Sequence, residues 1–295
     1  MTLLSKEGAP FGHAPAIISR RHRRCPEAQE MGDPRFWFVF GIGLFGILAA
    51  TPYPLMRAFA SGKRGRIPLP LLLLLQVLFN AALLWIATWA GLYFADRAGL
   101  GTPLIGAWLS GEGGAAVGLG DILGPTIGLG AAVGLILLLL GRLTVPKLLS
   151  AMWASAPWWQ RCLLAFYGGI TEEILLRLFL FSAVAWLFGK TSLARSPAGL
   201  LWLTNVLVAL AFGALHLPTL SALGLLRFGC AVAALFLNGI AGIAFGYLYW
   251  TRGLEAAMTA HLTADLCLHG IGSLLPSRAL GTSTPPAGGD GISVA

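Results

Sequence analysis

Seven long apolar segments constrain this chain more than any other feature of its sequence. They cover approximately residues 36–56, 68–95, 122–141, 161–188, 199–217, 227–250 and 254–275. A helix needs roughly 20 apolar residues to cross the hydrocarbon core of a bilayer. We therefore expect an all-α polytopic membrane protein, built as a bundle of about seven to eight transmembrane helices.

Composition and charge also indicate lipid surroundings. Of the 295 residues, 57% are hydrophobic and 11% are charged, whereas roughly a quarter of the residues in a soluble domain are charged. The formal net charge is +8, but the basic residues gather in the first 35 positions and in short loops, where orientation signals belong. We expect membrane lipids as partners and no nucleic acid.

The chain divides into four parts. Residues 1–35 form a basic cytoplasmic tail, and residues 36–150 form N-terminal membrane helices and loops. Residues 151–275 form a membrane core that carries unusual ionisable residues, and residues 276–295, rich in Gly, Ser, Thr and Pro, form a disordered tail. The N-terminal segment is polar, so we expect no cleavable signal peptide and a multi-pass integral protein. Its composition favours a bacterial inner membrane.

Loop charges predict the orientation of the bundle. Basic residues between 57 and 66 and between 142 and 161 mark the cytoplasmic side, while residues 96–121 are nearly uncharged or acidic and fit an outside loop. A first span that crosses the membrane would place the Arg-rich tail outside. Either residues 36–56, interrupted by Pro52 and Pro54, are re-entrant or interfacial, or the tail is an exception to the charge rule.

The fourth apolar segment contains charges that lipid penalises. An ionisable side chain at mid-membrane costs at least about 2.5–3.5 kcal/mol, so each one needs a reason. The sequence GGITEEILLRLFLF contains Glu172, Glu173 and Arg177. Glu173 and Arg177 are four residues apart and share a helix face, whereas Glu172 is rotated by about 100°. The spacing predicts one acid held by Arg177 and one working acid.

The last apolar segment carries a second ionisable stripe. His261, Asp265 and His269 follow each other at intervals of four residues and line one face of the expected helix. Glu172 and Asp265 each lie about 11 residues into their segments, or about 16 Å along a helix, so they can meet near the bilayer midplane.

A third ionisable position lies at the end of the fifth segment. His216 follows Phe212 by four residues and precedes Pro218. To join the other two groups it must remain within the membrane. We therefore expect residues 217–224 to continue at membrane depth as a bent or extended helix.

These residues resemble the motifs of a known family. EEILLR at 172–177, FGALH at 212–216 and HLTAD at 261–265 resemble the EExxxR, FxxxH and HxxxN/D motifs of the CPBP intramembrane proteases, which include the CAAX prenyl endopeptidases and the bacterial Abi proteins. The resemblance covers about residues 160–275, and the first 150 residues carry no family signature.

The resemblance implies an endopeptidase that hydrolyses a peptide bond in a membrane-tethered or lipidated substrate, with water activated by glutamate and histidine. It implies four catalytic residues, Glu172, His216, His261 and Asp265, and three supporting ones, Glu173, Arg177 and Phe212. Glu172 would activate the water that His216 helps to position. His261 and the residue at position 265 would stabilise the oxyanion.

Asp265 leaves three interpretations open. Asparagine can donate to an oxyanion, but an ionised aspartate only accepts hydrogen bonds. Asp265 is either protonated in its buried setting, or an orienting partner of His261, or a metal ligand. Glu172, His216, His261 and Asp265 could together bind zinc, as in a metalloprotease, but we favour a metal-free mechanism. His269 lies outside the motifs. It either polarises Asp265 or contacts interface water, and we favour the second.

Two other functions remain open at this point. The same buried ionisable residues could serve a noncatalytic scaffold or an ion- or proton-coupled transporter. The motifs could also be relics of a lost activity. The identity of the substrate, and whether it is prenylated, is not encoded in any recognisable motif.

Overall fold

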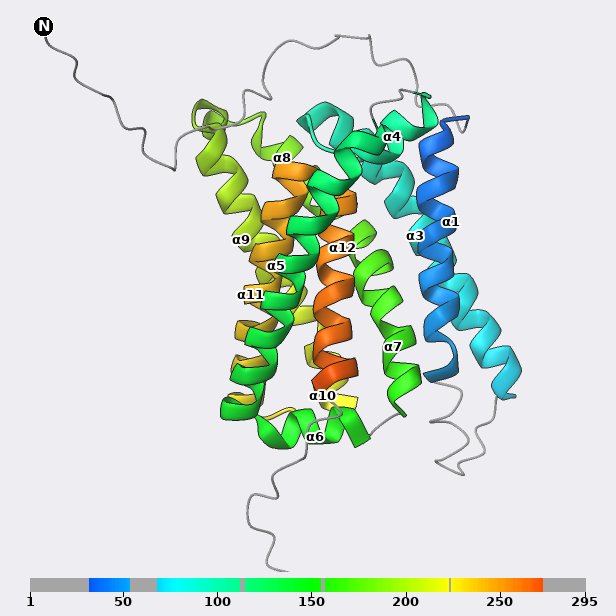
Figure 1. The fold of residues 1–295 in the computed structure, drawn as a ribbon, viewed down its shortest axis with the longest axis vertical. Coiled ribbons are helices and arrows are strands. Elements are labelled where there is room, and N and C mark those ends of the chain that lie inside the picture. The colour runs from blue at the N-terminus through cyan, green and yellow to red at the C-terminus, as the bar shows by residue number, and fades with distance from the viewer. Residues whose placement is uncertain (1–31, 54–67, 112–114, 155–156, 223, 273–295) are drawn as a thin grey trace, which may run out of the picture.

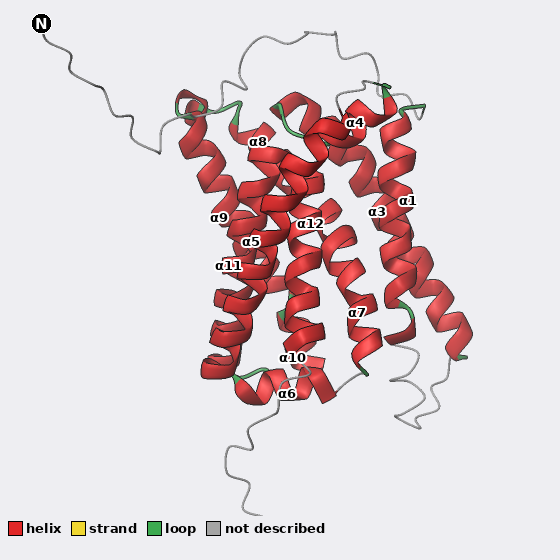
Figure 2. Cartoon of the chain, viewed as in Figure 1, coloured by secondary structure: helices red, strands yellow, loops and turns green. Residues whose placement is uncertain are grey.

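The computed structural model describes residues 32–53, 68–111, 115–154, 157–222 and 224–272. These residues form helices and no β-strand (Figure 2). Most of the predicted basic tail and all of the predicted C-terminal tail lie outside the described residues. The all-α class predicted from the apolar segments is confirmed.

The chain runs up and down through a bundle of helices (Figure 1). In order, these are α1 (Pro34–Ala50), α3 (Leu69–Ala98), α4 (Pro103–Leu109), α5 (Ala115–Thr144), α6 (Pro146–Ala154), α7 (Trp158–Phe166), η1 (Tyr167–Glu172), η2 (Ile174–Phe181), α8 (Ser182–Phe188), η3 (Ser192–Arg195), α9 (Pro197–Leu215), α10 (Leu217–Ala222), α11 (Phe228–Arg252), α12 (Leu254–Asp265) and η4 (Leu266–Ile271). The segments η1, η2 and η4 are π-helical, and η3 is a short 3₁₀ turn. The segments α7, η1, η2 and α8 follow one another as one helical path, and η4 continues α12.

The described residues of the predicted apolar segments are helical apart from single positions such as Thr51, His216 and Arg227, and several segments are long enough to cross a bilayer. Among the described residues, four candidate spans have the necessary length and composition: Leu69–Ala98, Leu123–Thr144, Pro197–Ala222 and Phe228–Arg252. The helix that contains the fifth apolar segment continues past its predicted end, because α10 follows α9 as far as Ala222. The chain is therefore an all-α integral membrane protein.

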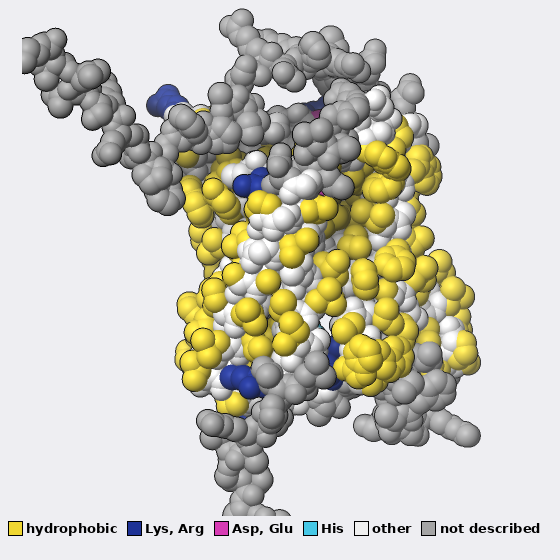
Figure 3. Space-filling view, viewed as in Figure 1, with side chains coloured by type: hydrophobic (Ala, Val, Ile, Leu, Met, Phe, Trp, Pro, Cys, Tyr) yellow, Lys and Arg dark blue, Asp and Glu magenta, His cyan; other side chains and the backbone are white. Residues whose placement is uncertain are grey.

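The outer surface of the bundle is strongly apolar. Large side chains such as Phe79, Leu143 and Phe228 are 70%, 71% and 87% exposed. Figure 3 shows hydrophobic side chains over the middle of one face, with basic side chains toward its two ends. A soluble monomer rarely exposes apolar patches of this extent, so this is the surface expected against lipid.

The first helix runs alongside its neighbour in the opposite direction. Nη2 of Arg35, at the start of α1, lies 2.9 Å from Oδ2 of Asp96, near the end of α3. Helix α1 is continuous over its 17 residues. Figure 1 places α4 and α6 at opposite ends of the bundle, as the opposite charge character of their loops predicts.

Small residues bring α5 and α12 into backbone contact. Gly130 and Gly134 are four residues apart on α5, and a Cβ atom at either position would collide with the carbonyl oxygen of Ala260 or Ala264, respectively, on α12. Membrane helices use such small residues at intervals of four to pack closely. Because α12 also carries His261 and Asp265, this packing sets the position of both side chains.

Replacing Gly130 with alanine should destabilise the bundle. The added methyl group collides with the Ala260 carbonyl, and overpacking of this kind costs about 1–3 kcal/mol. Gly128→Ala is the matched control, because a Cβ at that position meets nothing within 4 Å. Thermal unfolding in detergent should show a lower midpoint for Gly130→Ala than for Gly128→Ala, and equal midpoints would contradict the proposed packing.

Candidate active site

The helical path that contains the two adjacent glutamates is held by its neighbours on both sides. The hydroxyl of Thr171 donates to the carbonyl of Gly43 on α1 over 2.9 Å. Gly169 approaches the Leu262 backbone of α12 so closely that a Cβ would lie 2.7 Å from its Cα. The π-helical segments η1 and η2 flank Glu173, and π-helical turns are frequent at functional sites.

Glu173 is the buried centre of the site. Its Oε1 lies 2.7 Å from Nδ1 of His261, and its Oε2 lies 3.2 Å from Nε of Arg177. The side chains of Glu173 and Arg177 are both 0% exposed. The structure thus contains the pair that the four-residue spacing predicts, and it adds His261 as a second partner.

Two phenylalanine rings complete the surroundings of Arg177. Its guanidinium carbon lies 5.1 Å from the ring centroid of Phe212 and 6.0 Å from that of Phe245, which is cation–π geometry. Nη2 also donates to the Gly242 carbonyl over 3.3 Å. Phe212 therefore supports the buried cation, as the motif interpretation expects, whereas Phe245 was not identified from the sequence.

The orientation of His261 follows from its neighbours. The Phe245 ring stacks on the imidazole with a centroid distance of 4.5 Å and an interplanar angle of 20°. Because a carboxylate paired with Arg177 accepts hydrogen bonds, Nδ1 of His261 donates to Glu173. Nε2 then points to the other side, where it lies 3.7 Å from Oδ2 of Asp265.

His216 lies at the junction of α9 and α10, and its orientation is also defined. Its Nδ1 lies 2.9 Å from the carbonyl oxygen of Phe212. A carbonyl oxygen can only accept, so Nδ1 carries the proton and Nε2 of the neutral ring is an acceptor. His216 can therefore accept a hydrogen bond from a water molecule.

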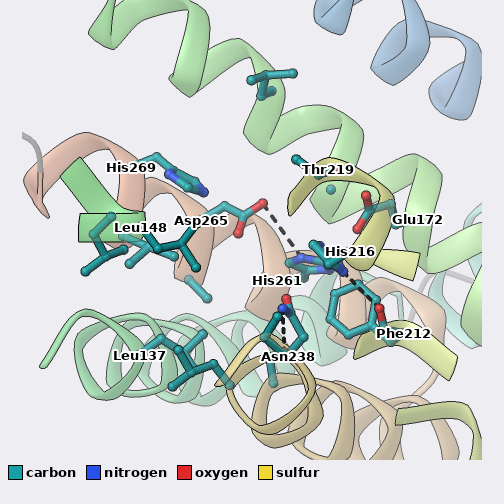
Figure 4. A pocket seen from close by; sticks show the side chains of 18 of the residues that line it. Leu137, Leu148, Glu172, Phe212, His216, Thr219, Asn238, His261, Asp265 and His269 are labelled. Carbon is teal, nitrogen blue, oxygen red and sulfur yellow. Dashed lines mark hydrogen bonds and ion pairs between the residues drawn. The ribbon is translucent and has the colours of Figure 1, made fainter. Parts of the chain in front are cut away.

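A cavity of about 270 Å³ brings the predicted catalytic side chains together. Glu172, His216, His261 and Asp265 all line it, as Figure 4 shows. In the described part of the chain the half-buried Glu172 carboxylate makes no hydrogen bond or ion pair with another side chain. The cavity therefore combines one acid without a fixed partner and two oriented histidines.

The remaining predicted residues fall into two groups. Phe212 lines the cavity, whereas Glu173 and Arg177 lie behind it. We favoured contact with interface water for His269, but this residue also lines the cavity. Its Nδ1 is buried and has no hydrogen-bond partner among the described residues. Asn238 of α11 is a further polar lining residue that sequence reasoning missed, and its isolation in an apolar segment was the available signal.

Asp265 approaches the site helix closely. A Cβ at position 168 would collide with Oδ2 of Asp265, so the glycine at that position leaves room for the carboxylate. Among the described residues, no group of three or more His, Cys, Asp or Glu side chains is arranged to hold a metal ion. The four side chains named as zinc donors line the same cavity.

Comparison with known proteins supports the motif interpretation. Residues 153–267 match the family model of the type II CAAX prenyl endopeptidase Rce1-like proteins. The match confirms the predicted CPBP intramembrane protease family for this segment, which contains all four predicted catalytic residues. It supports an intramembrane endopeptidase of the CAAX class and does not favour a scaffold or transporter. No curated protein and no solved structure gives a significant match to the chain.

Replacing Glu173 with glutamine should strongly destabilise the protein. The change leaves Arg177 buried without its counter-charge, and removal of one partner of a buried ion pair costs on the order of 3–5 kcal/mol. The matched control is Asp96→Asn, because the exposed Asp96–Arg35 pair is worth at most about 1 kcal/mol. Unfolding midpoints in detergent should separate the two variants, and a Glu173→Gln variant as stable as Asp96→Asn would refute the buried-pair account.

Proposed function

We propose that this protein is an intramembrane endopeptidase that hydrolyses a peptide bond in a lipidated, membrane-tethered substrate through a water molecule activated by Glu172 and His216. The observation that carries the proposal is the cavity itself, into which Glu172 and His216 both project. Glu173, by contrast, is occupied by Arg177 and His261. This leaves Glu172 as the acid that can take a proton from water.

In the proposed reaction, Glu172 accepts a proton from water while Nε2 of His216 accepts a hydrogen bond from the same molecule. The water oxygen forms a bond to the carbonyl carbon of the substrate, and the π electron pair moves to the carbonyl oxygen. When the tetrahedral intermediate collapses, the carbon–nitrogen bond breaks. Glu172 then returns its proton to the leaving amine, so the step requires no oxidant or other co-reactant.

Glu173 and Arg177 act through His261 in this proposal. The bond from Nδ1 to Glu173 fixes the imidazole so that Nε2 faces the cavity, and an orienting carboxylate of this kind is a recurrent device in hydrolases. Because Nδ1 already donates to Glu173, Nε2 donates toward the oxyanion when the ring is the doubly protonated imidazolium. Arg177 and the two phenylalanine rings hold Glu173 and His261 in place.

Asp265 has the role of an orienting partner in this proposal. Its Oδ2 lies 3.7 Å from Nε2 of His261, which supports the second of the three interpretations of this residue. An ionised aspartate cannot donate to the oxyanion, but it can attract the proton-bearing edge of the imidazole. The negative charge thus acts on His261 and not directly on the substrate.

The cavity walls favour an apolar substrate segment. Leu137 of α5, Leu148 of α6 and Leu237 of α11 line the cavity, and aliphatic residues or a lipid chain would pack against them. The family description names prenyl endopeptidases. We therefore propose a substrate whose cysteine carries an isoprenoid. From composition alone, we place the protein in the inner membrane of a bacterium.

Glu172→Gln should remove the activity without unfolding the protein. Cleavage of a farnesylated, internally quenched peptide in proteoliposomes should slow by about 10²–10⁴-fold, the contribution typical of a general base. Asp96→Asn, an acid outside the cavity, should cleave at the parent rate. A folded Glu172→Gln variant that retains the parent rate would rule out this mechanism.

The metal-free mechanism predicts activity without zinc. Protein treated with a chelator and shown by elemental analysis to contain substoichiometric zinc should cleave the farnesylated peptide at the rate of untreated protein, because Glu172 and His216 supply the water activation. Titration of zinc into the treated sample is the control. Loss of activity on chelation and its return with zinc would overturn the metal-free mechanism but not the peptidase assignment.

A further inference from the structure

The cavity contains a carboxamide that the proposed mechanism has not used. Among the described lining residues, Asn238 is the one with an amide side chain. It lies in α11 within the otherwise apolar run LFLNGIAG, where a polar residue is costly and marks a functional position. An amide both donates and accepts, which matches the groups of a peptide bond.

The orientation of this amide is fixed by its own helix. Nδ2 of Asn238 donates to the Ala234 carbonyl over 2.9 Å. A carbonyl can only accept, so the nitrogen and not Oδ1 must face Ala234. The second N–H of the same nitrogen is not used by this bond.

Asn238 lies on the face of α11 that packs against His261, the proposed oxyanion donor. Ala241 and Phe245 also line the cavity, and their spacing places them on the same face of α11 as Asn238. Phe245 stacks on His261, so this face is the one that supports the proposed oxyanion donor. In Figure 4 the Asn238 side chain enters the cavity in the region of His261, while Glu172 enters from another side.

Position 265 creates a need for such a donor. The motif that HLTAD resembles contains asparagine or aspartate at this position, and only asparagine offers an N–H. With aspartate at position 265 in this chain, His261 would be the single side-chain donor named so far for the oxyanion. Oxyanions are typically stabilised by two or more aligned donors.

We propose that Asn238 donates its free N–H to the oxyanion and so supplies the amide donor that position 265 lacks in this chain. The inference rests on the proposed peptidase function. Asn238 transfers no proton: as the water oxygen bonds to the carbonyl carbon, the negative charge that develops on the carbonyl oxygen strengthens the hydrogen bond from Nδ2. The contribution therefore belongs to the transition state and not to substrate binding.

Asn238→Ala tests this role directly with the farnesylated quenched peptide. We expect kcat to fall by about 10²-fold, as for removal of one oxyanion donor, with KM nearly unchanged. Asn80→Ala is the matched control. Asn80 lies on α3, outside the cavity, and its Nδ2 donates over 2.8 Å to the carbonyl of Gln76, four residues earlier, as Asn238 does to Ala234. A rise in KM alone, or a kcat equal to that of Asn80→Ala, would overturn the proposal.

A double-mutant cycle tests the replacement of the donor at position 265. Asp265→Asn places an amide at position 265. The factor by which Asn238→Ala lowers kcat should therefore be at least about tenfold smaller in that background than in the parent. An equal loss in both backgrounds would refute the replacement. If the parent cleaves the peptide and Glu172→Gln does not, the peptidase proposal stands whatever Asn238 shows. A parent that cleaves no such peptide contradicts both.

Discussion

The burial of Glu173 between Arg177 and His261 is the constraint on which the rest of the site depends. Glu173 and Arg177 are inaccessible to solvent, and a buried charge without a partner is strongly unfavourable. The ion pair, the Phe212 and Phe245 rings and the Gly242 carbonyl together compensate the buried charges, while Nη1 of Arg177 makes no hydrogen bond among the described residues. The same arrangement holds His261 with Nε2 toward Asp265 and the cavity. Stability and the proposed catalysis therefore rely on one set of contacts.

Much of this arrangement follows from local helix geometry and could be predicted from the sequence. The spacing of Glu173 and Arg177 predicts their pairing, which the structure contains at 3.2 Å. The same spacing leaves Glu172 rotated away from the pair, and Glu172 lines the cavity. The apolar segments predicted the all-α membrane fold because each helix must satisfy its own backbone in lipid. The roles assigned to Glu172 and its neighbours stay predictions.

Other features depend on contacts between distant segments, which no spacing rule describes. His261 and Glu173 are 88 residues apart, so the sequence could not show that Glu173 and not Asp265 receives Nδ1. Phe245 lies in a segment of ordinary apolar composition, and only packing places its ring on the imidazole. Leu137 and Leu148 line the cavity but precede the matched residues 153–267. Helices without a recognised motif thus form part of the site.

The central claim is that Glu172 activates a water molecule that attacks the substrate directly. A single turnover of the farnesylated peptide in H₂¹⁸O tests it, with mass spectrometry of both the product and the protein. The account predicts one ¹⁸O atom in the new carboxylate of every product molecule and none in the protein. Label in the Glu172 carboxylate, or unlabelled product from the first turnover, would show a covalent intermediate and contradict the account.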